Sequence, residues 1–213
     1  MSFSGPPEGG PREGIASEDI AGDPDFRHLS TIAGIAVDLR YATPNNFVGR
    51  DLYAPYDCAW LHRDAASALE RVVAWLARER PGYRALVLDA LRPQRVQQQL
   101  WDALEGTGLR LYLADPARGS IHSYGMALDI TLLDEQGREL DMGTGFDDMT
   151  ELSHPALEEG FLRSGALTDV QVANRRLLRD AMFQAGFVGI RTEWWHFDCG
   201  DRDLVRQTFR RVL

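Results

Sequence analysis

The chain has 213 residues, of which 44% are hydrophobic and 26% charged, and its formal net charge at pH 7 is -9. This length and composition are typical of one soluble globular domain with a sizeable core. The negative charge argues against a broad phosphate-binding face and against attachment to anionic membranes, so we expect no nucleic acid and no membrane as partners. The sequence contains no run that approaches the roughly 18 apolar residues of a membrane span.

The first 25 residues are rich in glycine, proline and charge. Such a segment buries little apolar surface, so we expect residues 1–25 to form a flexible tail and residues 26–213 to form the compact domain. The N-terminus lacks the charged-then-apolar pattern of a secretory signal. The two cysteines, Cys58 and Cys199, are too few for a disulfide framework. We therefore expect a cytoplasmic protein.

Apolar spacing predicts the main elements in chain order. Residues 62–79 carry apolar side chains at helical spacing and are followed by Pro81-Gly82, so they are predicted to form a helix. The other predicted elements are a buried strand at 84–90, a helix at 94–104, a strand at 126–133, a helix at 171–185 and a strand signal at 187–198. Helices and strands occur in clusters rather than in strict alternation. This favours an α+β fold, a single domain whose mainly antiparallel sheet is flanked by helices.

The segment from Ser120 to Thr131 carries the most informative polar residues. Large apolar side chains fall on one face of the predicted strand, and Asp129 falls on the other. A carboxylate inside such a strand is costly to bury unless it is paired or binds a metal. His122 lies just before the strand, across Gly125, whose conformational freedom permits a turn that folds His122 back beside Asp129. An imidazole and a carboxylate are ordinary zinc ligands.

A catalytic zinc site usually has a third protein ligand and an open position for water. His196, in the apolar run Glu193-Trp194-Trp195-His196-Phe197, is the candidate for the third ligand. Glu193 is the candidate general base, a carboxylate that does not bind the metal. In a regular strand Glu193 and His196 point to opposite faces. Both serve one site only if the backbone bends or bulges between them.

Arg92 follows the predicted strand at 84–90, and its permanently charged guanidinium suits the stabilisation of a tetrahedral oxyanion. Each candidate taken alone has a structural alternative: a histidine in an ordinary loop, an arginine in a surface ion pair, two tryptophans in the core. Together, the pattern H-x6-D and a distant E-x-x-H favour a metal site. This spacing is less diagnostic than H-E-x-x-H, which the chain lacks.

The patterns S-x-H-x-x-G-x-A-x-D and E-x-W-H resemble those of the zinc D,D-peptidases, and most closely the VanX-type D-alanyl-D-alanine dipeptidase family. The resemblance spans about residues 35–198. It includes the segments at 38–43, 92–93, 142–149 and 174–178. The chain departs from the family at Leu91, where a tyrosine is usual, and in the spacing of residues 50–60.

This resemblance implies one zinc ion per chain, bound by His122, Asp129 and His196. It implies that Glu193 is the catalytic base and that Arg92 stabilises the transition state. The implied fold is similar to that of the Hedgehog-type zinc peptidase domains, which agrees with the α+β prediction.

The substrate implied by the resemblance is a small D,D-dipeptide, D-alanyl-D-alanine or a related one, hydrolysed to free amino acids. Asp147 would receive the substrate's ammonium group, and Ser120 and Tyr53 would lie near its carboxylate. The implied setting is the turnover of cell-wall precursors, in glycopeptide resistance or in recycling. Two alternatives remain open: a D,D-carboxypeptidase acting on longer cell-wall peptides, and a non-catalytic binding module that kept the fold.

Overall fold

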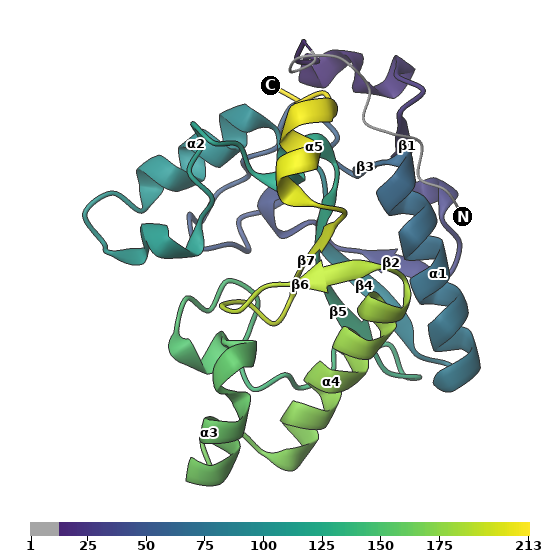
Figure 1. Ribbon diagram of the computed structural model, residues 1–213, viewed down its shortest axis with the longest axis vertical. Helices are drawn as coiled ribbons and strands as arrows, with labels where there is room; N and C mark the ends of the chain where they lie inside the picture. The colour runs from purple at the N-terminus through teal and green to yellow at the C-terminus, as the bar shows by residue number, and fades with distance from the viewer. Residues whose placement is uncertain (1–12) are drawn as a thin grey trace.

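A computed structural model describes residues 13–213 of the chain, and a mixed sheet of five strands lies at its centre (Figure 1). The order of the strands in this sheet is β2-β4-β5-β7-β6, and β1 and β3 form a separate antiparallel pair. The strands are β1 Phe26–His28, β2 Ile35–Val37, β3 Trp60–His62, β4 Arg84–Asp89, β5 Ala127–Leu133, β6 Phe187–Gly189 and β7 His196–Cys199. β2 runs parallel to β4, and the remaining neighbours in the sheet are antiparallel. The predicted α+β class with a mainly antiparallel sheet is confirmed.

The helices pack around this sheet. They are α1 Arg63–Glu79, α2 Gln94–Ala103, α3 Glu158–Ser164, α4 Asp169–Gln184 and α5 Arg202–Thr208. Short 3-10 helices occupy Ser17–Gly22, Leu29–Thr31, Arg40–Ala42, Leu109–Tyr112, Ile121–Tyr124, Glu151–Ser153 and Pro155–Leu157. α1 packs against α4, and both contact strands of the sheet. Within residues 13–213, no helix combines the length and the apolar character that a membrane crossing requires.

The strand β5 is the buried centre of the sheet, because β4 and β7 flank it and all seven of its residues are buried. Leu128, Ile130 and Leu132 are fully buried. The burial of each of these side chains contributes roughly 1.5–3 kcal/mol, which offsets the cost of burying Asp129 in the same strand. Asp129 is paired in register with His196 of β7 on one side, and with the end of β4 on the other.

The predicted helices at 62–79, 94–104 and 171–185 correspond to α1, α2 and α4. The strand signal at 187–198 is divided, because β6 ends at Gly189 and β7 begins at His196. Glu193 therefore lies in the connection between two antiparallel strands rather than in a strand. This connection provides the change of direction that was predicted for Glu193 and His196 if both serve one site.

The ordered domain begins before Phe26, so the predicted flexible tail at residues 1–25 extends too far. Residues 1–12 of that tail lie outside the described residues. Ile15 and Ile20 are buried, and Ile15 forms a β-bridge with Val212 near the C-terminus. These two isoleucines bury enough apolar area for the segment to pack against the domain. The prediction missed this because it rested on the glycine and proline content of the region.

Gly125 joins the 3-10 helix Ile121–Tyr124 to β5 with a φ of +64°. A Cβ atom at this position would lie 2.6 Å from the backbone nitrogen of His62. A left-handed backbone costs a residue other than glycine roughly 1–2 kcal/mol. We expect Gly125→Ala to lower the free energy of unfolding by more than this, because the added Cβ would also clash with the backbone of His62, which cannot move aside as a side chain can. Urea denaturation measures the difference.

The matched control is Gly165→Ala at the end of α3, where φ is +76° and an added Cβ meets nothing within 4 Å. This variant carries the conformational cost without the clash. Equal losses of stability in the two variants would contradict the close approach at Gly125.

Candidate active site

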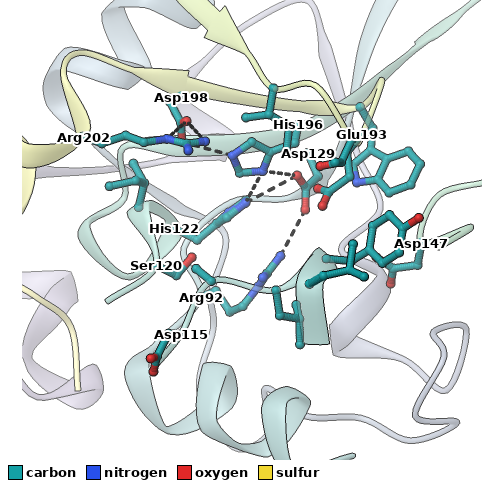
Figure 2. A pocket seen from close by; sticks show the side chains of 18 of the residues that line it. Arg92, Asp115, Ser120, His122, Asp129, Asp147, Glu193, His196, Asp198 and Arg202 are labelled. Atoms are coloured by element: carbon teal, nitrogen blue, oxygen red, sulfur yellow. Dashed lines mark hydrogen bonds and ion pairs between the residues drawn. The ribbon is translucent and has the colours of Figure 1, made fainter. Parts of the chain in front are cut away.

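A cavity of about 510 Å³ lies at the end of the sheet that carries Asp129 and His196 (Figure 2). Most of the residues predicted to form the site line this cavity: Arg92, Ser120, His122, Asp129, Asp147, Glu193 and His196. They come from the loop after β4, the 3-10 helix before β5 and its N-cap, β5 itself, the loop after it, the connection between β6 and β7, and the start of β7. The fold therefore brings segments that are distant in sequence to one concave surface.

Three potential metal ligands converge inside this cavity. One ligand atom from each of His122, Asp129 and His196 lies within 4.8 Å of the other two. Nε2 of His122 is 3.1 Å from Nδ1 of His196, and this Nδ1 is 3.0 Å from Oδ1 of Asp129. The β5–β7 register places Asp129 opposite His196, and the turn at Gly125 returns His122 to the same point.

Hydrogen bonds on the far side of each imidazole fix which nitrogen faces the cluster. His122 Nδ1 donates to the carbonyl oxygen of Ala90 at 2.8 Å, which leaves its Nε2 as an unprotonated ligand. His196 Nε2 donates to the Asp198 carboxylate at 3.0 Å, so the neutral form of this ring has its lone pair on Nδ1. With both rings neutral, two nitrogen lone pairs and the Asp129 oxygen face one another, an arrangement that is repulsive unless a proton or a metal ion lies between them. The residues present fit a divalent metal ion.

The charges around the cluster also favour a cation. Burial lowers the pKa of His196, but the carboxylates of Asp198 and Asp129 outweigh it and raise this pKa to about 10. Burial raises the pKa of Asp129, but His122 and His196 together lower it below its usual value. Asp129 is therefore ionised at neutral pH, and the space beside His196 accepts either a proton or a metal ion.

Arg92 is buried beside the cluster and is held by two carboxylates. Its Nε donates to Asp89 at 2.8 Å, and its Nη2 lies 2.6 Å from Asp89 and 3.1 Å from Asp129. Its guanidinium also lies over the ring of Tyr41, 5.0 Å from the centroid. Burial opposes the charge, but Asp89 contributes most to raising the pKa of Arg92 well above its usual value. Arg92 is thus a permanent cation in the cavity wall, fixed before any substrate binds.

Tyr53, which the family resemblance places near the substrate, does not line the cavity. Its side chain is almost completely buried, and its hydroxyl donates to Asp89, the carboxylate that holds the arginine. The tyrosine that lines the cavity is Tyr41, whose hydroxyl lies 2.9 and 3.1 Å from the two carboxylate oxygens of Asp147. Sequence reasoning did not select Tyr41. The available signal was its place in the segment 38–43.

Asp147 presents to the cavity a carboxyl group that accepts from Tyr41 but has no cationic partner. Its backbone has a φ of +60°, which is uncommon for a residue other than glycine. Enclosure raises its pKa well above the usual value, and the charge of Asp129 raises it further. Within residues 13–213, no lysine or arginine forms an ion pair with Asp147. A strained backbone and an enclosed carboxyl group together are typical of a binding position.

The loop that carries Asp147 is anchored by Arg175 of α4. Arg175 is buried, and it donates to the carbonyl oxygens of Met142 at 2.6 Å and Leu152 at 3.0 Å. These two acceptors lie on either side of Asp147 in the sequence. The loop is therefore held to a helix at two points, which fixes the position of the Asp147 carboxyl group.

Glu193 completes the cavity wall beside the ligand cluster, and Figure 2 shows its side chain next to Asp129 and His196. Enclosure raises the pKa of Glu193 to about 7. The neighbouring His196 opposes this rise, and the charge of Asp129 adds to it. A carboxyl group with a pKa near neutrality can accept and release a proton at neutral pH.

The chain is similar to a described peptidase family and to several known proteins. The peptidase M15 family model, described as D-ala-D-ala dipeptidase, matches residues 25–212. A D-alanyl-D-alanine dipeptidase of Escherichia coli (strain K12) is 39% identical over 167 residues, which cover 77% of this chain and 78% of that protein. One of Enterococcus faecium is 30% identical over 206 residues, covering 86% and 96%. The solved structure of the LdcB LD-carboxypeptidase matches with a TM-score of 0.47 and 17% identity, over 85% of this chain and 71% of that one.

Metal-dependent hydrolases typically hold a metal ion with imidazole and carboxylate ligands and place a second carboxyl group, with a pKa of about 7, beside it. The cavity of this chain has these groups. The chain belongs to the D-ala-D-ala dipeptidase family of metallopeptidases. The predicted family and the prediction of a metallopeptidase are confirmed.

Replacement of Asp129 tests the ligand cluster. We expect protein stripped with a chelator to bind one equivalent of zinc, and Asp129→Asn to weaken this binding by more than about 100-fold, because the variant loses the ionised ligand. Competition with a chromophoric chelator measures the affinity. Asp115→Asn is the control, since Asp115 lines the same cavity outside the cluster. Equal zinc affinity in the two variants would remove Asp129 from the ligand set.

Proposed function

We propose that the chain is a zinc-dependent dipeptidase that hydrolyses D-alanyl-D-alanine, or a closely related dipeptide, to free amino acids. One observation supports this function above all. The cluster of His122, Asp129 and His196 shares one cavity with Glu193, whose pKa is about 7, and with Asp147, whose carboxyl group lacks a cationic partner. The relatives in Escherichia coli and Enterococcus faecium bear the name of this activity.

Zinc held by the two histidines and Asp129 would supply a Lewis acid, able to polarise the scissile carbonyl and to lower the pKa of water to about 7. Glu193 accepts the proton of the attacking water and then donates it to the leaving amine. A pKa of about 7 suits both transfers at neutral pH. By donating through their other ring nitrogens to Ala90 and Asp198, His122 and His196 direct Nε2 and Nδ1 towards the metal position.

Arg92 stabilises the negative charge that develops on the carbonyl oxygen. Asp89 holds its guanidinium through Nε and Nη2, so the cation needs little reorganisation when that charge appears. Tyr53 supports this geometry through its hydrogen bond to Asp89. Tyr53 thus contributes to orienting Arg92 rather than to contacting the substrate carboxylate.

A dipeptide is recognised at its two free ends. Asp147 binds the ammonium group of the substrate, which forms with its carboxyl group the ion pair that the protein alone does not provide. Ser120 lies on the other side of the ligand cluster from Asp147 (Figure 2) and offers a hydroxyl to the carboxylate. Arg118 and Arg206 line the cavity close to Ser120, since Arg206 donates to the carbonyl oxygen of Gly119. Cations at this end and an anion at the other end match the polarity of a free dipeptide.

Glu193→Gln tests the base. The amide keeps the size of the side chain but cannot accept a proton, so we expect normal zinc content and a kcat for D-alanyl-D-alanine that falls by about 10²–10⁴-fold. The exposed Glu159 of α3 provides the control Glu159→Gln, which should keep full activity. In the unchanged protein, kcat/KM should fall as the pH decreases below about 7, because Glu193 becomes protonated. Normal turnover in Glu193→Gln would exclude this residue as the base.

Acetylation of the substrate's amino group separates a dipeptidase from the alternative D,D-carboxypeptidase. If Asp147 binds the ammonium group, N-acetyl-D-alanyl-D-alanine should have a kcat/KM at least about 100-fold below that of the free dipeptide. Asp147→Asn should slow hydrolysis of the free dipeptide and so reduce the ratio of kcat/KM between the free and the acetylated substrate. The control Asp115→Asn should leave this ratio unchanged. Equal or faster hydrolysis of the acetylated substrate would favour the carboxypeptidase.

A further inference from the structure

Each of the three metal-ligating side chains is held by a second group on its far side. His122 is held by the carbonyl oxygen of Ala90, and Asp129 is held by Arg92. The partner of His196 is Asp198, whose Oδ1 lies 3.0 Å from His196 Nε2. The family patterns in the sequence assign no role to Asp198. Its contact with a ligand nevertheless makes it part of the same assembly.

The backbone makes this contact possible. Asp198 is two residues after His196 in β7, so the two side chains project from the same face of the strand. The Asp198 side chain is only 4% exposed, and a carboxylate in such a position is costly unless both of its oxygens are paired. Both are paired here: Oδ1 accepts from His196, and Oδ2 accepts from Arg202.

Arg202 holds Asp198 from the beginning of α5. Its Nε and Nη2 each lie 2.5 Å from Asp198 Oδ2, so the guanidinium contacts this oxygen through two donors. Asp201 caps α5 by accepting from the backbone nitrogens of Asp203 and Leu204, which fixes the helix start that carries Arg202. Figure 2 shows Arg202, Asp198 and His196 in a row that ends at the ligand cluster.

We propose that Asp198 and Arg202 are a positioning pair that sets the ring orientation and the tautomer of His196 for metal binding. This role rests on the proposed zinc site. With Asp198 in place, Nε2 carries the ring proton and Nδ1 faces the metal position. Without Asp198, the ring loses the acceptor that selects this tautomer and opposes a flip about its bond to Cβ. A carboxylate partner also makes the imidazole a stronger ligand.

Zinc affinity is the measurement that reports this role, because Asp198 acts through His196 rather than on the substrate. We expect Asp198→Ala to weaken zinc binding by about 10–100-fold in competition with a chromophoric chelator. Asp198→Asn keeps an acceptor oxygen and should restore part of the affinity. Arg202→Gln should produce a smaller loss than Asp198→Ala. The control Asp203→Asn, on an exposed acid of the same helix, should bind zinc as the unchanged protein does.

A merely structural role, in which the ion pair ties β7 to α5, has a different signature. It would lower the thermal stability of the metal-free protein and leave zinc affinity unchanged. Zinc affinity within twofold of the unchanged protein in folded Asp198→Ala would therefore overturn the proposal. If Asp198→Ala does not fold, unchanged affinity in both Asp198→Asn and Arg202→Gln would overturn it.

The result is separable from the proposed function. Failure of the unchanged protein to bind zinc would overturn the positioning pair together with the metal site. Tight zinc binding that depends on Asp198, without hydrolysis of D-alanyl-D-alanine, would reject the proposed substrate and support the positioning pair.

Discussion

The antiparallel pairing of β5 with β7 places Asp129 directly opposite His196, and the geometry of the site depends on this register. A shift of one residue would turn His196 to the opposite face of the sheet. The register is well specified, because β5 is buried along its whole length. The turn at Gly125 then only has to return His122 to a point that the sheet has already defined.

The distribution of charge in the cavity shows where bound groups are needed. Buried charges are costly unless they are paired, and Arg92 pairs with both Asp89 and Asp129. Two positions are left short of positive charge: the space between the ligand atoms, and the carboxyl group of Asp147. In the proposed function, a metal ion supplies the positive charge at the first position, and the ammonium group of the substrate supplies it at the second. Both positions lie in one cavity, so the proposed metal site and the proposed binding of a free amino terminus share the same space.

The parts of this site that depend on local pattern could be predicted from the sequence. The alternation of apolar and other residues along 126–133 placed Asp129 on the face opposite the apolar side chains. Gly125 indicated the turn that brings His122 back beside Asp129. The spacing of Glu193 and His196 required a change of backbone direction, which the β6–β7 connection provides. Such features follow from the period of a strand and from the conformational freedom of glycine.

The parts that depend on tertiary contact could not be predicted in this way. Tyr53 and Tyr41 both lie in the N-terminal region that resembles the family, and only the fold decides which of them reaches the cavity. The role of Asp198 could not be predicted from the sequence, because its partner Arg202 lies in a helix for which the sequence contains no motif. The packing of residues 13–25 depends likewise on a β-bridge to Val212, close to the other end of the chain.

Diffraction data collected on both sides of the zinc absorption edge, from crystals grown with zinc, test the central claim most directly. One strong anomalous peak is predicted, coordinated by Nε2 of His122, a carboxylate oxygen of Asp129 and Nδ1 of His196, with Glu193 beside it and outside the coordination sphere. A peak bound elsewhere, or a His196 ring turned so that Nε2 faces the metal, would contradict the account.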